Sequence, residues 1–255
     1  MEQTAVYRYF IELSYRGTRY HGWQVQANAS SVQGEVNRAL STLLGAPTET
    51  FGAGRTDTGV HARFYVAHFD STAAGLENDP KFLYHLNRIL PSDIAVKKMY
   101  RVKQDANARF DAIAREYEYV ICRTKNPFFN GLAWIYQGHL NLEWMQLASQ
   151  QLTGYSDFTS FSKLGSNRRN NLCKIFKASW LQQDDLLIFS ITANRFLRNM
   201  VRAIVGTLVD VGRGKITPED FARIVEASDR SLAGTSAPAE GLYLSKVEYP
   251  NEIFL

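Results

Sequence analysis

The order of predicted strands and helices is the feature of this sequence that most limits its fold. Apolar and polar residues alternate from Tyr7 to Tyr15, which is the pattern of a strand with one buried face. A helical pattern follows from Val32 to Leu44, and Ser30 with Gln33 indicates a capping box at its start. The next segments predict a short strand at 48–51, a strand at 63–69, a helix that Asp79 caps, and a strand at 94–102. This order, βαββαβ, is that of the ferredoxin-like arrangement.

The second half of the chain repeats this order of elements, although no residue-level repeat is visible. Strands are predicted at 115–123, 172–181, 186–193 and 242–249, an extended piece at 133–136, and helices after Asn141, at 196–211 and after Thr217. We therefore expect an α+β protein of two ferredoxin-like halves, residues 1–105 and 106–255. Their mainly antiparallel sheets should join side by side around a central cleft.

Composition and charge narrow the class of protein. The 255 residues are 45% hydrophobic, which is enough for a sizeable core in one large domain or two small ones. The net charge of +4 favours a polyanionic partner, although solubility alone would also explain it. The two cysteines, Cys122 and Cys173, do not have the spacing of a metal site, and the five histidines do not have it either. This spacing leads us to expect no metal. Because the sequence shows no signal peptide and no apolar run of about 18 residues, we expect a cytoplasmic protein without a membrane segment.

A loop rich in glycine lies between two of the predicted strands. Residues 52–62 read Gly-Ala-Gly-Arg-Thr-Asp-Thr-Gly-Val-His-Ala, with Arg55 two residues before Asp57. Glycine is used where the backbone turns sharply or approaches another group closely, so this loop offers a carboxylate a fixed position beside a cation. A polar turn between strands is the competing interpretation. A dinucleotide-binding fingerprint is excluded because Asp57 stands at its third glycine position, and no P-loop motif is present.

The predicted helix at 196–211 carries a cation in an apolar setting. Apolar residues cover nearly all of its faces, and one polar stripe runs along it, formed by Arg195, Arg198, Asn199 and Arg202. An isolated buried arginine would cost several kcal/mol, so Arg202 should meet a carboxylate or line a cleft. Asp57 is the candidate partner. Extension of Arg202 to solvent, or its pairing with Glu240, is the alternative.

Two further segments carry candidates for contact with nucleic acid. Residues 15–24 interleave cations, among them Arg16 and Arg19, with aromatic residues and glycines, which suits phosphate contact combined with base stacking. The polar loop at 161–171 is too long for a simple turn and holds Lys163, Arg168 and Arg169. Taken alone, residues 15–24 are a weak signal that only slightly favours nucleic acid over a surface loop, and a solvated loop explains residues 161–171 equally well.

The glycine loop resembles the active-site signature of the tRNA pseudouridine synthase A family, whose central aspartate is catalytic. Residues 52–61 match that signature as Gly-x-Gly-Arg-Thr-Asp-x-Gly-Val-His. The family pattern is echoed in order along nearly the whole chain, in Tyr20-x-Gly22-Trp23-Gln24, Ser31-Val32-Gln33, Ala108-Arg109-Phe110, Ala114-Arg115-x-Tyr117-x-Tyr119, Gly154-x-x-Asp157-Phe158-x-Ser160-Phe161, Met200-Val201-Arg202-x-Ile204-Val205-Gly206 and Ala239-Glu240-Gly241-Leu242-Tyr243-Leu244. A match of this length and order is highly specific.

The resemblance implies a homodimeric, cofactor-free isomerase that converts uridine to pseudouridine at positions 38 to 40 of tRNA, in the anticodon arm. It implies that Asp57 is catalytic, that Tyr117 packs against the target base, and that Leu242 completes the apolar side of the pocket. Arg202 would pair with Asp57, and together with Arg55 it would favour the ionised carboxylate by opposite charge. The target base must leave its stack to be reached. Attack by the carboxylate at C1′ and proton abstraction at the 2′ carbon both remain open.

The sequence departs from the common family pattern at positions outside the catalytic group, namely Thr58, Asn107, Glu116, Glu118 and Asn170. These departures bear on contacts with RNA. Two other functions compete with the isomerase. A non-catalytic RNA-binding protein that uses the same cleft would gain by losing Asp57, because a carboxylate repels phosphate. A metal-dependent nuclease would need several converging acids, whereas the glycine loop holds one.

Overall fold

The computed structural model describes residues 5–163 and 170–255, and the chain in it divides into two compact units. Unit 1 comprises Met1–Ile113 together with Leu244–Leu255, and unit 2 comprises Ala114–Tyr243. This division differs from the boundary expected at residue 105. The first unit extends to Ile113, and the C-terminal segment belongs to it rather than to the second half of the chain.

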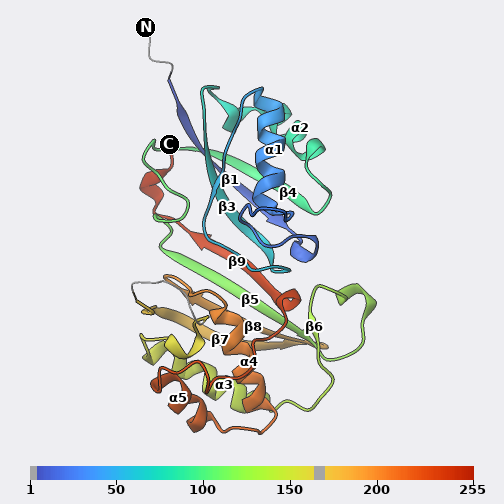
Figure 1. Cartoon of the computed structure of the whole chain (residues 1–255), viewed down its shortest axis with the longest axis vertical. Helices are drawn as coiled ribbons and strands as arrows, with labels where there is room; N and C mark the ends of the chain where they lie inside the picture. Colours follow the sequence, from blue (N-terminus) through green and yellow to red (C-terminus); the bar gives the residue numbers. More distant parts are fainter. Residues whose placement is uncertain (1–4, 164–169) are drawn as a thin grey trace. The chain divides into compact units, whose positions relative to one another are not determined.

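Unit 1 is a sheet with two helices over one of its faces (Figure 1). The central strand β1 (Tyr7–Tyr15) is antiparallel to both β3 (His61–Ser71) and β4 (Ile94–Val102), and the short strand β2 (Phe51–Gly52) pairs with β3. The helices α1 (Val32–Leu44) and α2 (Pro80–Ile89) lie against each other. From β1 to β4 the elements therefore follow in the order that the sequence predicts, with Asp79 as the N-cap of α2.

The start of α1 differs from the prediction. Its N-cap is Ser31 rather than Ser30, and Gln33 does not complete a capping box. Instead, Gln33 Nε2 donates to the carbonyl of Thr50 at 2.6 Å, and its Oε1 accepts from the amide of Val25 at 2.9 Å. The Gln33 side chain, which the local pattern assigned to the helix cap, thus links α1 to Val25 and Thr50 instead.

The C-terminal segment completes unit 1. The amide of Ile113 donates to the carbonyl of Glu248 at 2.9 Å. The ring of Tyr249 packs edge-on against Phe10 of β1, with 5.2 Å between ring centroids. Residues 106–113, which were expected to open the second half, are therefore part of the first unit.

Unit 2 is also a sheet with helices over one face (Figure 1). Its central strand β8 (Leu186–Ala193) is antiparallel to β5 (Ala114–Cys122) and β7 (Ile175–Gln183), and the short β6 (Trp134–Ile135) is parallel to β5. The helices are α3 (Leu142–Gln151), α4 (Met200–Gly212) and α5 (Pro218–Glu226), which pack on one another. Asn141 and Thr217 cap α3 and α5 as predicted. Strand β9 (Leu242–Glu248) begins in unit 2 and continues into unit 1.

The helix that carries Arg202 is shorter than expected. It begins at Met200, because Asn199 has a left-handed backbone with φ of 66° and the residues before it are not helical. Asn199 Nδ2 instead donates to Ser236 Oγ at 2.6 Å. The prediction of a polar stripe along one helix is therefore wrong, since of Arg195, Arg198, Asn199 and Arg202 the last alone lies in α4.

Both units have mainly antiparallel strand pairing, so the protein belongs to the mixed α+β class, as the sequence predicts. Within the described ranges, no helix has the length and apolar character that crossing a membrane requires. The core of each unit is formed by side chains that have no exposed surface, such as Tyr9 and Phe69 in unit 1 and Tyr119 and Phe189 in unit 2. These cores hold in place the strands, the helix and the loops that carry the candidate site residues.

Candidate active site

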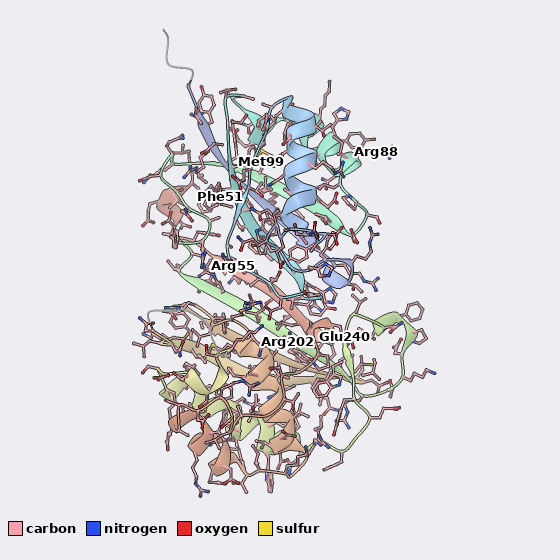
Figure 2. The ribbon with its side chains drawn as sticks, viewed as in Figure 1. Phe51, Arg55, Arg88, Met99, Arg202 and Glu240 are labelled. Atoms are coloured by element: carbon pink, nitrogen blue, oxygen red, sulfur yellow. The ribbon has the colours of Figure 1, made fainter. Side chains whose placement is uncertain are left out.

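Asp57 lies at a tight turn in the loop between β2 and β3. The amide of Val60 donates to the carbonyl of Asp57 at 3.2 Å. Gly59, with φ of 79°, supplies the left-handed conformation at the third position of this turn. Asp57 is half-buried, and Arg55 is exposed on the same loop (Figure 2). The turn therefore gives a carboxylate a fixed backbone position beside an exposed cation.

A second segment, residues 16–23, is bonded directly to this turn. The amide of Gly59 donates to the carbonyl of Tyr20 at 3.2 Å. The amide of Gly17 donates to Nδ1 of His61, a side chain that is 1% exposed, at 2.9 Å. The aromatic and basic segment that the sequence singles out thus lies against the loop of Asp57.

Two glycines allow this close approach. A Cβ on Gly17 would lie 1.9 Å from the carbonyl oxygen of Val60, and a Cβ on Gly22 would lie 2.1 Å from that of Thr56. Gly22 also has φ of 91°, a conformation that side chains disfavour. Glycine is therefore required at both positions because the loop of Asp57 lies against them. A turn within the segment is not the only reason.

Arg16 and Arg19 are both exposed on this segment. Arg19 Nε lies 3.5 Å from Asp93 Oδ2, and the hydroxyl of Tyr20 donates to Asp93 Oδ1 at 2.6 Å. Burial raises the pKa of the Tyr20 hydroxyl, and the Asp93 carboxylate raises it further, so the hydroxyl stays a donor. The two guanidinium groups are accordingly presented from a segment whose backbone is anchored to the Asp57 loop and to Asp93.

Thr56, next to Asp57, is held by its side chain. Its Oγ1 lies 2.9 Å from the Tyr15 hydroxyl and accepts a hydrogen bond from the amide of Trp23 at 3.1 Å. The ring of Trp23 stacks on Tyr65 with 4.2 Å between centroids, and the Tyr65 hydroxyl donates to the carbonyl of Gly54. The sequence did not single out these contacts, although the placement of Gly17 and Gly22 was a signal that another segment lies against the loop.

In unit 2 the candidate residues lie on β5, on α4 and at the start of β9. Tyr117 of β5 is half-buried, with its ring edge-on to Phe196 at 5.0 Å between centroids. Leu242 is buried and begins β9. Arg202 of α4 donates through Nε to the carbonyl of Ala237 at 2.7 Å, and the amide of Ala237 donates back to the carbonyl of Arg202 at 2.9 Å. The guanidinium is therefore oriented by the segment that leads into β9.

Tyr119 connects β5 to that same segment and was not among the predicted site residues. Its hydroxyl donates to the carbonyl of Pro238 at 2.8 Å, and a Cβ on Gly241 would lie 2.7 Å from its ring. Burial raises the pKa of the Tyr119 hydroxyl; Arg202 opposes this effect and Glu240 adds to it. Both charged residues, labelled in Figure 2, therefore lie near this hydroxyl.

Lys163 is exposed, and its amide donates to the carbonyl of Arg198 at 3.2 Å. Arg195 Nη1 donates to Asn170 Oδ1 at 3.2 Å. Both contacts join the loop that contains Lys163 to the segment before α4, which gathers three cations in unit 2. Arg168 and Arg169 lie outside the described residues.

The loop offers a carboxylate, Asp57, that can act as a nucleophile or as a base. Cationic side chains lie on the same loop and on the segment bonded to it. Residues 5–163 and 170–255 contain no group of three or more His, Cys, Asp or Glu side chains that could hold a metal ion.

Comparison with known proteins shows to which family this chain belongs. The family described as tRNA pseudouridine synthase matches residues 148–250. The chain is 53% identical to tRNA pseudouridine synthase A of Bacteroides fragilis, over 98% of this chain and 99% of that protein. It is 51% identical to the protein of the same name from Porphyromonas gingivalis, over 97% and 99% of the two chains.

The chain belongs to the tRNA pseudouridine synthase A family. A more distant member, from Acetivibrio thermocellus, is 41% identical over 93% of this chain and 97% of that protein. The likeness to tRNA pseudouridine synthase A proteins thus extends over both units, and it is not confined to the C-terminal range of the family match. The resemblance that the glycine loop indicated is confirmed.

Proposed function

We propose that this tRNA pseudouridine synthase isomerises uridine at positions 38 to 40, in the anticodon arm of tRNA, with Asp57 as its catalytic residue. The observation that carries the proposal is the turn of Asp57, which is fixed by Val60 within the loop and by Tyr20 through Gly59. The relatives that cover nearly the whole chain carry the name tRNA pseudouridine synthase A. These backbone bonds give the Asp57 side chain a defined starting point, which a group that acts on a substrate requires.

The reaction breaks the N1 to C1′ glycosidic bond, turns the uracil and rejoins it through C5, so it is redox-neutral. Asp57 acts either as the nucleophile at C1′ or as the base at the 2′ carbon. Tyr117 and Leu242 supply the apolar wall against which the flipped base packs. Arg202 pairs with Asp57 through its terminal nitrogens, since its Nε is used by Ala237, and Arg55 adds a second positive charge.

We place this site between two ferredoxin-like halves whose sheets join around a central cleft. In unit 1, β1 lies between β4 and β3 and β2 pairs with β3, all antiparallel as in a βαββαβ unit, while β9 is a further neighbour of β3. In the second half, β5, α3, β7, β8, α4 and β9 follow one another as a strand, a helix, two strands, a helix and a strand, apart from the short β6 and the additional helix α5. The resemblance to the family further supports a cytoplasmic homodimer.

The exposed cations on both units supply the contacts with tRNA phosphates. Arg16 and Arg19 lie on the segment anchored to the Asp57 loop, and Lys163 lies beside the segment before α4. Arg168 and Arg169 follow Lys163 in the sequence and belong to the same proposed contact. Phosphate contacts position an RNA on a protein, so these residues should govern tRNA affinity more than the chemical step.

The test is pseudouridine formation in an unmodified tRNA with uridine at positions 38 to 40, incubated with purified protein in EDTA and read by carbodiimide mapping. Asp57→Asn and Asp57→Ala should abolish product while tRNA affinity stays within about threefold of the wild type, because most affinity comes from phosphate contacts. Asp184→Asn is the matched control. It removes a carboxylate from the exposed turn between β7 and β8, where φ is 51°, which asparagine tolerates.

Tight tRNA binding by the wild type without pseudouridine would favour the non-catalytic RNA-binding protein instead. Measurable turnover by Asp57→Ala would reject Asp57 as the catalytic residue.

A further inference from the structure

Thr56 is tied to two elements that are distant from it in sequence. Its Oγ1 lies 2.9 Å from the hydroxyl of Tyr15, at the end of β1, and accepts from the amide of Trp23 at 3.1 Å. Tyr15 and Trp23 are 4% and 2% exposed, so both partners are rigidly packed. Both bonds are part-buried, so removing Oγ1 would leave the Tyr15 hydroxyl and the Trp23 amide with less access to water than on an open surface.

The main chain of Thr56 is also enclosed. Gly22 leaves no room for a Cβ beside the Thr56 carbonyl, since the oxygen would lie 2.1 Å from it. That carbonyl belongs to the peptide that joins Thr56 to Asp57. The Thr56 side chain therefore fixes one side of this peptide, and the turn closed by Val60 fixes the other side of Asp57.

We propose that Thr56 is a positioning residue, whose Oγ1 aligns the Asp57 carboxylate for reaction through its bonds with Tyr15 and Trp23. The inference rests on the proposed function, because Asp57 is the group that it positions. Alignment acts on the chemical step, in which misplacement of a reacting group by about 1 Å can cost about 100-fold in rate. Affinity for tRNA should change little, because Thr56 is not one of the phosphate-contact candidates.

Three variants isolate the role of the Oγ1 atom. Thr56→Val keeps the shape of the side chain and removes the oxygen, whereas Thr56→Ser keeps the oxygen and removes the methyl group. Tyr15→Phe removes one partner hydroxyl and keeps the ring that packs against Trp23 and Tyr65. Thr50→Val is the control for loss of stability alone, because it removes a buried bond from Thr50 Oγ1 to Asn37 in the same unit.

The measurements are the single-turnover rate at saturating enzyme, the Kd for tRNA, the melting temperature, and amide hydrogen exchange in residues 54–60. For Thr56→Val we expect a rate about 10- to 100-fold below the wild type, a Kd within threefold, and faster exchange of the loop amides. Thr56→Ser should restore the rate to within about threefold. Tyr15→Phe should lower it less than Thr56→Val, and the double variant should be no slower than Thr56→Val alone.

A Thr56→Val variant with wild-type rate and wild-type exchange in the loop would overturn the proposal. So would Thr56→Ser being as slow as Thr56→Val, or Thr50→Val being equally slow at an equal loss of melting temperature. If the wild type forms no pseudouridine, the proposed function fails by that result alone. The exchange measurement then still decides whether Oγ1 orders the backbone around Asp57.

Discussion

His61 and His68 are two buried histidines of unit 1 whose hydrogen bonds require an unprotonated ring nitrogen. Each accepts a hydrogen bond at Nδ1, His61 from Gly17 at 2.9 Å and His68 from the amide of Ala108 at 3.1 Å. An imidazole accepts a bond only at a nitrogen that carries no proton. Burial and, to a smaller extent, the Arg8 guanidinium together lower the pKa of His68 to about 4.

Because this pKa is lowered in the folded state, the unfolded chain binds a proton at His68 between about pH 6.5 and 4 that the folded chain does not. The stability that this histidine contributes is therefore present above pH 6.5 and is lost as the pH falls to 4. We expect His68→Asn, whose amide oxygen can accept from Ala108, to reduce the loss of unfolding free energy over this range by on the order of 2 kcal/mol. Urea unfolding at several pH values measures this. Wild-type and variant curves that run parallel from pH 7 to pH 4 would contradict it.

At the scale of residues, the sequence predicted the groups with a chemical signature and missed those defined by tertiary contacts. Asp57 was proposed as the reactive group because glycines and Arg55 surround it in the sequence itself, and this assignment stays a prediction. Thr56 was not, because its bond with Tyr15 joins residues that are 41 positions apart. Gln33 was assigned to a helix cap for the same reason, since nothing local shows that it reaches Thr50.

At the scale of elements, α4 and the segment after α5 depend on one glycine. A Cβ on Gly206 would lie 1.8 Å from the carbonyl oxygen of Thr235 and 3.2 Å from the amide nitrogen of Ala237. Backbone atoms cannot move aside as a flexible side chain can, so any larger residue must push the segment away from the helix. That segment also carries the carbonyl that holds Arg202.

We expect Gly206→Ala to lower the unfolding free energy by about 3 kcal/mol or more, at the upper end of the range for overpacking. Gly154→Ala is the control, because a Cβ there meets nothing within 4 Å and the residue is exposed. Chemical denaturation of both variants compares them directly. Equal stability of the two would show that the segment moves aside without cost.

Element boundaries were predictable where a local capping residue sets them. Asp79, Asn141 and Thr217 cap α2, α3 and α5, and each was identified from its place before a helical pattern. The start of α4 was misplaced because the apolar pattern continues through Phe196 and Leu197, while the boundary is set by the left-handed backbone of Asn199. No residue type in the sequence marks that conformation, since asparagine adopts it only in some contexts.

At the scale of the whole molecule, the proposed pairing of Asp57 and Arg202 links residues from unit 1 and unit 2. Removing one member of a fully buried ion pair costs about 3 to 5 kcal/mol, and a smaller cost is expected here because Asp57 and Arg202 are both half-buried. We therefore expect Asp57→Asn and Arg202→Met each to lower stability, and the double variant to recover much of that loss without recovering activity. Unfolding free energies of the four proteins give the coupling. Arg202→Met removes the bond to Ala237 whether residue 57 is Asp or Asn, so the loss of this bond cancels in the coupling free energy.

Coupling below about 0.5 kcal/mol, the value for independent sites, would reject the pairing. The activity of the single variants is a second readout. Arg202→Met should lose most of its turnover because the carboxylate is no longer held. Wild-type turnover by this variant would show that Asp57 acts without Arg202.

The division into units was the least predictable feature of the whole molecule. The boundary expected at residue 105 followed from the repeated order of elements, which is a local property. The observed boundary depends on the bond between Ile113 and Glu248, whose partners lie in distant parts of the sequence.

The return of Leu244–Leu255 to unit 1 also has a consequence for how the protein is made. A ribosome releases the chain from its N-terminus onward, so the continuous unit 2 is complete in sequence before the last residues emerge. Unit 1 begins first but cannot pack Phe10 against Tyr249, or close the bond between Ile113 and Glu248, until residues 248 and 249 have been synthesised. The unit that carries the glycine loop therefore depends on a later part of the sequence than unit 2 does, so its core closes only after all of unit 2 has been synthesised.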